Sequence, residues 1–185
     1  MELVWPSERY LASYVQALER GWSGDNIRGQ AATKEELQAI AHDPAAFLAT
    51  LVDPEAKGAP IELPDGSKAE RIPGYRRWMW DGEFCGSIGL RWQRGTNDLP
   101  PHVLGHIGYA VVPWKQGRGY ATLALRLTLE AAQAEGLAYV ELTTDEDNAP
   151  SQRVITANGG VLLERFRKIA AHGGAESLRF RIDLA

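Results

Sequence analysis

The chain has 185 residues, a formal net charge of −4 and one cysteine, Cys85. These features exclude an intramolecular disulfide and a cysteine-based metal cluster, and they speak against a large basic surface for nucleic acid. The length suits one domain that buries its own core.

The N-terminal segment lacks the basic region and apolar run of a signal peptide. No stretch approaches the roughly 18 apolar residues of a membrane helix. We therefore expect a cytoplasmic protein without a membrane partner.

The first part of the chain predicts a short edge strand followed by helices. The strand spans Leu3–Trp5, and Ser7 is placed to cap a helix that runs to Arg20. Thr33, with Glu36 three residues on, predicts the capping box of a second helix. Pro44 begins a third helix through Leu51, and a polar loop rich in Pro and Gly follows to residue 70.

The character of the sequence then changes. Residues 74–92 predict a β-hairpin whose Asp81-Gly82 pair favours a type I′ turn. A loop over 93–104 follows. The remaining elements are predicted as strand 105–112, helix 121–135, strand 139–143, helix 148–157, and a last hairpin of strands 161–170 and 177–184 around the turn AHGGA. This order predicts an α/β fold with a mixed sheet.

The stretch Gln116-Gly117-Arg118-Gly119-Tyr120-Ala121 joins a strand to a helix. Glycines allow the backbone to approach an anion, and the N–H groups at a helix start carry the positive end of the helix dipole. The stretch is neither a P-loop, which needs Gly-Lys-Ser/Thr, nor a dinucleotide fingerprint, because Thr122 stands at the third glycine position. A plain turn remains the alternative interpretation.

Two motifs resemble those of one family. Gln116-x-x-Gly119-x-Ala121 matches the Q/R-x-x-G-x-G/A loop of the GCN5-related N-acetyltransferases, the GNAT superfamily. Downstream, the run from Asn148 to Gly160 resembles the N-x-x-S-x-R-V-I-x-x-x-G-G segment of its ribosomal-protein N-terminal acetyltransferase branch, and the surroundings resemble predicted bacterial acetyltransferases. The resemblance covers about Tyr75–Asp183. It implies a sheet, mostly antiparallel, that splays between its fourth and fifth strands, with helices on both faces.

The resemblance also implies an acetyl-CoA site. The pyrophosphate would lie on the backbone of the glycine loop, namely Gln116, Gly117, Arg118, Gly119, Tyr120, Ala121 and Thr122. The pantetheine arm would enter the splay, where a strand bulge and the backbone of Val111 and Val112 would bind it. Asn148 would bond the pantetheine region, and Ser151 would approach the sulfur. Plain N-capping by Asn148 and solvation of Ser151 are the structural alternatives.

The resemblance assigns the catalytic groups less directly than the acetyl-CoA site. Many family members place a tyrosine in the helix after Asn148 to protonate the leaving thiolate, but Ile155 stands there in this chain. Ser151, a water molecule or Tyr109 are the substitutes that we consider. For the base that accepts the amine proton, the candidates are His106 and Glu141, with His102 as a second histidine close to the splayed strand; the ordinary pKa of histidine suits the task. His102 and His106 lack the partners of a metal site, so we expect no metal.

Together these features predict one GNAT domain over residues 1–185. Residues 1–70 would be a variable helical part that lines the acceptor site, and residues 71–185 would form the core with the acetyl-CoA site. The predicted activity is transfer of an acetyl group to a primary amine of a small molecule or peptide by direct attack. The rival is a GNAT-fold protein that binds CoA without catalysis. Edge strands at the C-terminus could pair two copies into a homodimer, and no nucleic-acid partner is expected.

Overall fold

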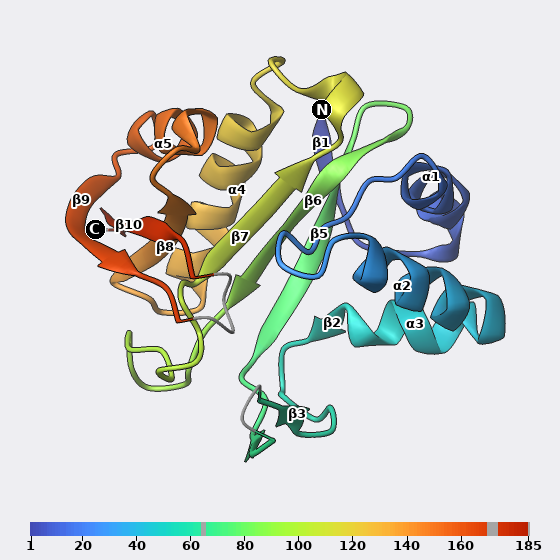
Figure 1. Cartoon of the computed structure of the whole chain (residues 1–185), viewed down its shortest axis with the longest axis horizontal. Coiled ribbons are helices and arrows are strands. Elements are labelled where there is room, and N and C mark those ends of the chain that lie inside the picture. The colour runs from blue at the N-terminus through green and yellow to red at the C-terminus, as the bar shows by residue number, and fades with distance from the viewer. Residues whose placement is uncertain (64–65, 170–173, 185) are drawn as a thin grey trace.

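The computed structural model describes residues 1–63, 66–169 and 174–184. Two sheets form its centre (Figure 1). In the larger sheet, strands β5, β6 and β7 are antiparallel neighbours in this order. Strands β1 and β2 each pair with β5, at different positions along it. The smaller sheet has the order β8-β10-β9. The strands of these two sheets span β1 Glu2–Val4, β2 Val52–Asp53, β5 Gly74–Trp80, β6 Phe84–Arg91, β7 Ile107–Val111, β8 Tyr139–Asp145, β9 Val161–Arg167 and β10 Glu176–Asp183.

Helices cover both faces of the sheets (Figure 1). On one side lie α1 Glu8–Glu19, α2 Gln30–His42 and α3 Pro44–Thr50, and on the other α4 Tyr120–Ala134 and α5 Ala149–Thr156. The short elements are β3 Ile61–Glu62, β4 Lys68–Ala69 and the 3-10 helix η1 Pro113–Lys115. Within the described residues, no helix is long and apolar enough to cross a membrane. The α/β architecture predicted from the sequence is confirmed.

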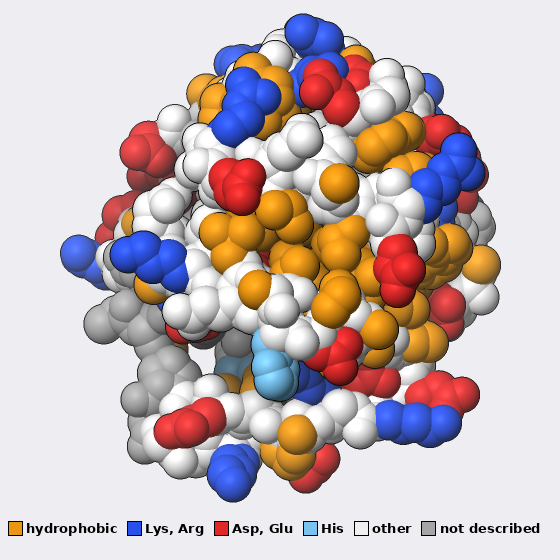
Figure 2. Space-filling model, turned by 90° about the vertical axis from the view of Figure 1, so that its right-hand side faces the viewer, with side chains coloured by type: hydrophobic (Ala, Val, Ile, Leu, Met, Phe, Trp, Pro, Cys, Tyr) orange, Lys and Arg blue, Asp and Glu red, His pale blue; other side chains and the backbone are white. Residues whose placement is uncertain are grey.

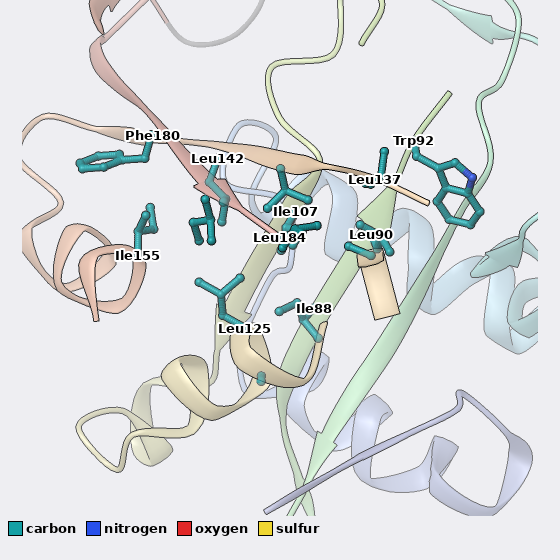
Figure 3. Packing of buried hydrophobic residues seen from close by; sticks show 14 of the residues in the cluster. Ile88, Leu90, Trp92, Ile107, Leu125, Leu137, Leu142, Ile155, Phe180 and Leu184 are labelled. Carbon is teal, nitrogen blue, oxygen red and sulfur yellow. The ribbon is translucent and has the colours of Figure 1, made fainter. Parts of the chain in front are cut away.

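Strand alternation divides the core into two clusters. Ile88 and Leu90 of β6 pack with Leu125 of α4 and Ile155 of α5 (Figure 3). On the opposite face, Tyr14 of α1 stacks on Trp78 of β5 with ring centroids 4.6 Å apart. Successive residues of a strand point to opposite faces, so each sheet residue contributes to one helical layer only.

The predicted cap of the second helix was wrong. Helix α2 begins at Gln30 after Gly29, whose φ is +49°, and Thr33 is buried inside it. The Thr33 hydroxyl donates to the carbonyl of Trp22 at 3.1 Å, and Glu36 accepts the hydroxyl of Tyr14 instead of serving a capping box. Tertiary contacts therefore use both side chains that the local pattern assigned to the cap.

The hairpin was predicted correctly, but its turn type was not. Trp80 pairs with Phe84, so three residues, Asp81 to Glu83, connect the strands. Only Gly82 of these has a positive φ, of 108°, whereas a type I′ turn needs two such residues. In the last hairpin, residues 171–173 of the predicted AHGGA turn lie outside the described residues.

Candidate functional site

Strands β7 and β8 are hydrogen-bonded at one end and unpaired over the rest of their described length, and we call this unpaired stretch the gap. The backbone N–H of His106, just before β7, donates to the carbonyl of Glu141 in β8 at 2.7 Å. The N–H of Glu141 returns a bond to Nδ1 of the His106 ring at 2.9 Å. We call these two hydrogen bonds the His106 clip. Beyond it the strands belong to different sheets, with no ladder between them in the described part of the chain. The predicted splay is thus present, and one histidine joins its closed end.

The open edge of β7 is defined by its pairing with β6. Val112 donates its N–H to the carbonyl of Cys85 at 2.9 Å, so that group faces β6. Alternate residues of a strand direct their N–H groups to the same side, so Tyr109 and Val111 direct theirs into the gap. The β6–β7 register runs without a shift from Leu90–Ile107 to Gly86–Val111. Val111 is therefore available to a ligand, but the expected bulge is absent from this ladder and the N–H of Val112 is already bonded.

The glycine loop follows β7 and opens helix α4. Gly117 and Gly119 have φ values of +74° and +75°, which L side chains rarely adopt. No heavy atom lies within 4 Å of a Cβ built on either glycine, so the space above the loop is open. The N–H groups of residues 119–122 donate to no acceptor among the described residues. Open space and unpaired donors at a helix start fit a phosphate group.

Asp81 holds this loop in place. Its carboxylate accepts the Tyr120 hydroxyl at 2.6 Å and the Lys115 ammonium at 3.0 Å. Burial disfavours the charged form of Asp81, but these hydrogen bonds outweigh it and hold the pKa of its carboxyl well below its usual range. Sequence reasoning missed this contact, because it assigned Asp81 to the hairpin turn and nothing local indicates a partner in the glycine loop.

Helix α5 lies on the other side of the gap. Asn148 caps it by accepting the N–H of Ser151 at 3.1 Å, as predicted for an N-cap. Asn158, just past the helix end, donates to the carbonyl of Thr122 at 3.2 Å and so ties α5 to the start of α4. The glycine loop and the Asn148 helix, predicted separately, are fixed beside each other by this contact.

Tyr109 and Ser151 meet across the gap. The two hydroxyl oxygens are 2.9 Å apart, and Tyr109 also reaches the Ser151 carbonyl at 3.3 Å. Burial raises the pKa of the Tyr109 phenol to about 12, although its bond to Ser151 acts in the opposite direction. The phenol is therefore protonated at neutral pH and is a hydrogen-bond donor. Ile155 is buried in the core, so helix α5 offers no phenol of its own.

The two candidate bases are fully engaged. His106 is 1% exposed; its Nε2 lies 3.0 Å from the carbonyl of Asn97, and its Nδ1 accepts from Glu141. That pair of partners assigns a neutral ring with its proton on Nε2. Burial lowers the pKa of His106. The Glu141 carboxylate binds Arg181 at 2.7 Å and Arg179 at 3.1 Å; burial opposes its charge, but these arginines keep its pKa below the usual value.

A polar cavity of about 310 Å³ adjoins the closed end of the gap. Glu141, Arg179 and Arg181 line one wall, and the loop after β6 lines the other with Asn97 to Pro101 and Val103. His102 lies in this loop. The described residues contain no cluster of three or more His, Cys, Asp or Glu side chains that could hold a metal ion.

Comparisons with known proteins agree with this arrangement. The family model described as "Acetyltransferase (GNAT) domain" matches residues 30–161, so the chain belongs to the GNAT acetyltransferase family. Its members are N-acetyltransferases, and the enzyme class predicted from the sequence is confirmed. No curated protein matches the chain.

Solved structures with the same fold include several acetyltransferases. One is the microcin C7 self-immunity acetyltransferase MccE in complex with acetyl-CoA and AMP, at 13% identity and a TM-score of 0.60, covering 98% of this chain and 91% of that one. Another is RimL, the ribosomal L7/L12 alpha-N-protein acetyltransferase, with coenzyme A. It is 13% identical, has a TM-score of 0.62, and the match covers 98% of this chain and 92% of that one. A third is YncA from Salmonella typhimurium with acetyl-CoA. It is 12% identical, has a TM-score of 0.57, and the match covers 100% of this chain and 94% of that one.

The His106 clip predicts a pH-dependent stability. Because the pKa of His106 is lower in the fold than the value of about 6.5 in the unfolded chain, the unfolded chain binds more protons below pH 6.5. The contribution is complete above that pH and is lost as the pH falls towards the folded pKa. From pH 7.5 to 5.5 this group should cost at most about 1.4 kcal/mol of unfolding free energy.

Urea unfolding at both pH values tests this expectation. In His106→Asn, a side-chain carbonyl replaces Nδ1 as the acceptor and does not titrate, so the pH-dependent loss should shrink. His102→Asn, in the neighbouring loop, is the matched control and should behave like the wild type. The same loss in His106→Asn and the wild type would contradict the role of the clip.

Proposed function

We propose that this protein transfers an acetyl group from acetyl-CoA to a primary amine of a small molecule or peptide. The observation that carries the proposal is the gap between β7 and β8, with an open strand edge on one side and an anchored glycine loop at its mouth. MccE and YncA were solved with acetyl-CoA, which supports this donor.

The residues of the gap fit the two parts of the donor. The unpaired N–H groups at the start of α4, with Gly117, Gly119 and the exposed Arg118, would hold the pyrophosphate. Gln116 donates to the carbonyl of Val111 at 3.3 Å and so links the loop to the strand edge. The backbone of Val111 would pair with the pantetheine amides as an added strand would.

Tyr109 and Ser151 would stabilise the leaving thiolate. A thiol of CoA has a pKa of about 8.5 by analogy with cysteine, so a phenol of pKa about 12 does not transfer its proton completely. It can donate a hydrogen bond to the sulfur as negative charge develops there. The Ser151 hydroxyl, 2.9 Å away, would donate its one proton to the phenol oxygen and so hold the phenol in position.

The amine must lose a proton before or during its attack. Both His106 nitrogens and both Glu141 oxygens already have partners, and the low pKa of Glu141 makes it a weak base. We therefore assign these two residues to shaping the gap, and we propose that water in the adjoining polar cavity accepts the proton. Residues 1–70, with α1 to α3, and the loop after β6 would form the acceptor side of this single domain.

Replacing Gly119 by Glu tests the donor site. The carboxylate would repel the pyrophosphate and occupy the space above the loop, so acetyl-CoA binding should become undetectable by calorimetry while circular dichroism remains that of the wild type. Gly136→Glu is the matched control, because Gly136 also has a positive φ, of 86°, with no atom within 4 Å, at the far end of the same helix. Normal acetyl-CoA binding by Gly119→Glu would contradict the phosphate-binding role of the loop and leave it as a plain turn.

Replacing Tyr109 by Phe tests the leaving-group role. Removing one donor from the developing thiolate should lower kcat about tenfold to a hundredfold with little change in acetyl-CoA affinity. The readout is release of free CoA thiol across a panel of amines. Tyr75→Phe, on the opposite side of β6, should leave kcat unchanged. Thermal stabilisation by acetyl-CoA without turnover on any amine would instead favour a CoA-binding protein that lacks catalysis.

We also propose that a second copy of this chain pairs with β9. Within the part of the chain that the structure describes, this strand pairs on one edge only, with β10. Val161, Leu162 and Leu163 are 66%, 43% and 47% exposed. Consecutive residues face opposite sides, so both faces of the strand expose apolar groups. A two-fold antiparallel pairing that sets Glu164 opposite the partner subunit's Arg165 also sets Leu163 opposite the partner subunit's Phe166.

Light scattering after gel filtration measures this association. The wild type should elute as a dimer, and Leu163→Lys should be a monomer because a charge then meets the apolar strand edge. Ile27→Lys, on an equally exposed apolar residue far from β9 in sequence, should remain a dimer. A monomeric wild type at micromolar concentration would refute the pairing.

A further inference from the structure

Two arginines lie side by side on the sheet face that α1, α2 and α3 partly cover. Arg76 of β5 is two residues before Trp78, and Arg91 of β6 is four residues after Ser87, the pairing partner of Trp78. Both therefore point to the face where Tyr14 stacks on Trp78. Figure 2 shows the outer surface of the side on which α1, α2 and α3 lie, with charged side chains around an apolar area.

The floor between these arginines has no side chains. Gly89 of β6 pairs with Arg76 on one side and with Gly108 of β7 on the other. A Cβ at Gly89 would meet its nearest atom at 3.4 Å, and a Cβ at Gly108 would lie 3.8 Å from Nη2 of Arg91, which are ordinary contacts. Neither glycine has a positive φ. Backbone strain and crowding therefore do not require glycine here, and a bare strand surface suits close approach of a ligand.

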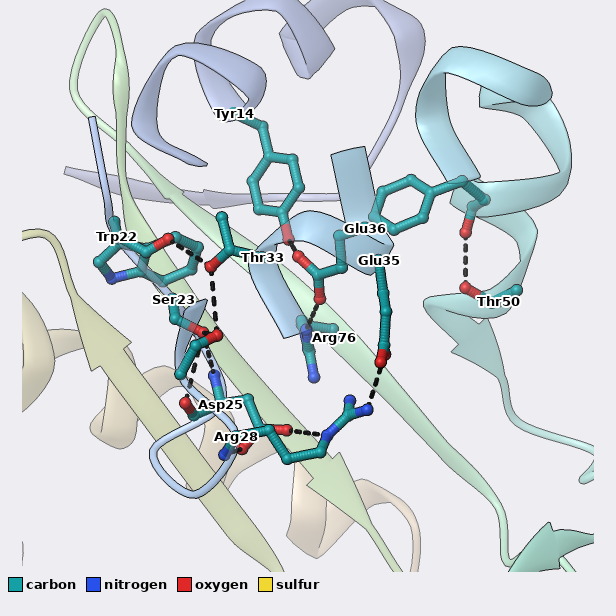
Figure 4. Close-up of polar contacts among 12 residues, drawn as sticks. Tyr14, Trp22, Ser23, Asp25, Arg28, Thr33, Glu35, Glu36, Thr50 and Arg76 are labelled. Atoms are coloured by element: carbon teal, nitrogen blue, oxygen red, sulfur yellow. Dashed lines mark hydrogen bonds and ion pairs between the residues drawn. The ribbon is translucent and has the colours of Figure 1, made fainter. Parts of the chain in front are cut away.

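The charge of these arginines is incompletely balanced. Arg91 donates from Nε to the carbonyl of Gly105 at 2.8 Å and forms no ion pair with any carboxylate in the described ranges. Among the carboxylates of the described ranges, Arg76 has one loose partner, Glu36 of α2, at 3.8 Å (Figure 4). Burial lowers the pKa of Arg91, and the charge of Arg76 lowers it further. Two neighbouring guanidinium groups without a full counter-charge favour an added anion.

The α1–α2 loop overhangs the same place. A Cβ at Gly24 would lie 3.6 Å from the Ser87 hydroxyl and 3.8 Å from Nη1 of Arg76. The reacting edge is also close, because Tyr109 follows Gly108 directly in β7 and Val111 is three residues after Gly108. Three residues of strand span roughly 10 Å. A group held between the arginines is thus within a short molecule's length of the gap.

We propose that Arg76 and Arg91 bind an anionic group of the acceptor, a carboxylate or a phosphate, over the Gly89–Gly108 floor. The inference rests on the proposed acetyl transfer and narrows its acceptors to amines that carry an acid within roughly 10 Å of the nitrogen. Bidentate guanidinium contacts suit both anions. The acid anchors the molecule, and its amine reaches the gap.

Three amines with one aminoethyl frame, and one longer diamine, separate the possibilities. β-Alanine carries a carboxylate, phosphoethanolamine a phosphate, ethanolamine a neutral hydroxyl, and putrescine a second cation. Calorimetry with the full chain, with and without CoA, should show one or both acids binding at least about tenfold more tightly than ethanolamine and putrescine. Whichever acid binds better identifies the anion. Equal or tighter binding of ethanolamine or putrescine, or no binding of any amine to the CoA complex, would overturn the proposal.

Variants assign the effect to the arginines. Arg91→Gln should lose the preference for the acid, and Arg91→Lys should restore most of it because the charge returns. Gly108→Val should fold at least as stably as the wild type, yet weaken binding of the acid by filling the floor. Arg126→Gln, an exposed arginine on α4 across the sheet, is the control. An unchanged preference in both Arg91→Gln and Gly108→Val would refute the site.

Binding of CoA alone is measured first, because it tests the proposed function separately. If CoA fails to bind but the acids bind through Arg91, the acetyl-transfer proposal fails and the anion site stands. If CoA binds and turnover occurs on neutral amines with Arg91→Gln unimpaired, the anion site fails and acetyl transfer stands.

Discussion

The site depends on one short contact, the pair of hydrogen bonds between His106 and Glu141. A continuous ladder between β7 and β8 would close the sheet and leave no room for a ligand. The histidine ring uses one acceptor atom to bond a single strand residue, and its other nitrogen is bonded to the loop carbonyl of Asn97. Pairing therefore stops after one residue. A Cβ at Gly105 would lie 2.9 Å from the carbonyl of Glu141, so close approach at this end also needs glycine.

The two sides of the sheet around the gap present different chemical groups. On the α4 and α5 side, backbone N–H groups and the Tyr109–Ser151 pair face the open strand edge, which suits a donor that is recognised mainly through its backbone-like amides and phosphates. On the α1 to α3 side, side chains dominate: Arg76, Arg91 and Glu36 come from different elements. One fold can host many activities, because function resides in the site that the fold carries.

This division also explains what the sequence could predict. The glycine loop and the Asn148 cap depend on neighbours a few residues away, so local patterns identified them. The Val112 N–H is bonded to Cys85, and its direction depends on the register with β6, which lies outside its own segment and which a local pattern therefore does not show. The same holds for Thr33, whose hydroxyl bonds Trp22 rather than its own helix start. Arg76 and Arg91 become neighbours only through pairing of β5 with β6, and Asp81 reaches Lys115 and Tyr120 over more than thirty positions.

The Asp81 contact has a consequence for conformational entropy. A glycine-rich loop normally loses much backbone freedom when a ligand orders it, and that loss reduces the affinity. Here the carboxylate of the hairpin turn already fixes Lys115 at one end of the loop and Tyr120 at the other. The loop is thus ordered when the chain folds, before any ligand arrives. The free energy of the contacts between the loop and its ligand then contributes almost in full to the measured affinity, because little of it is offset by ordering the loop.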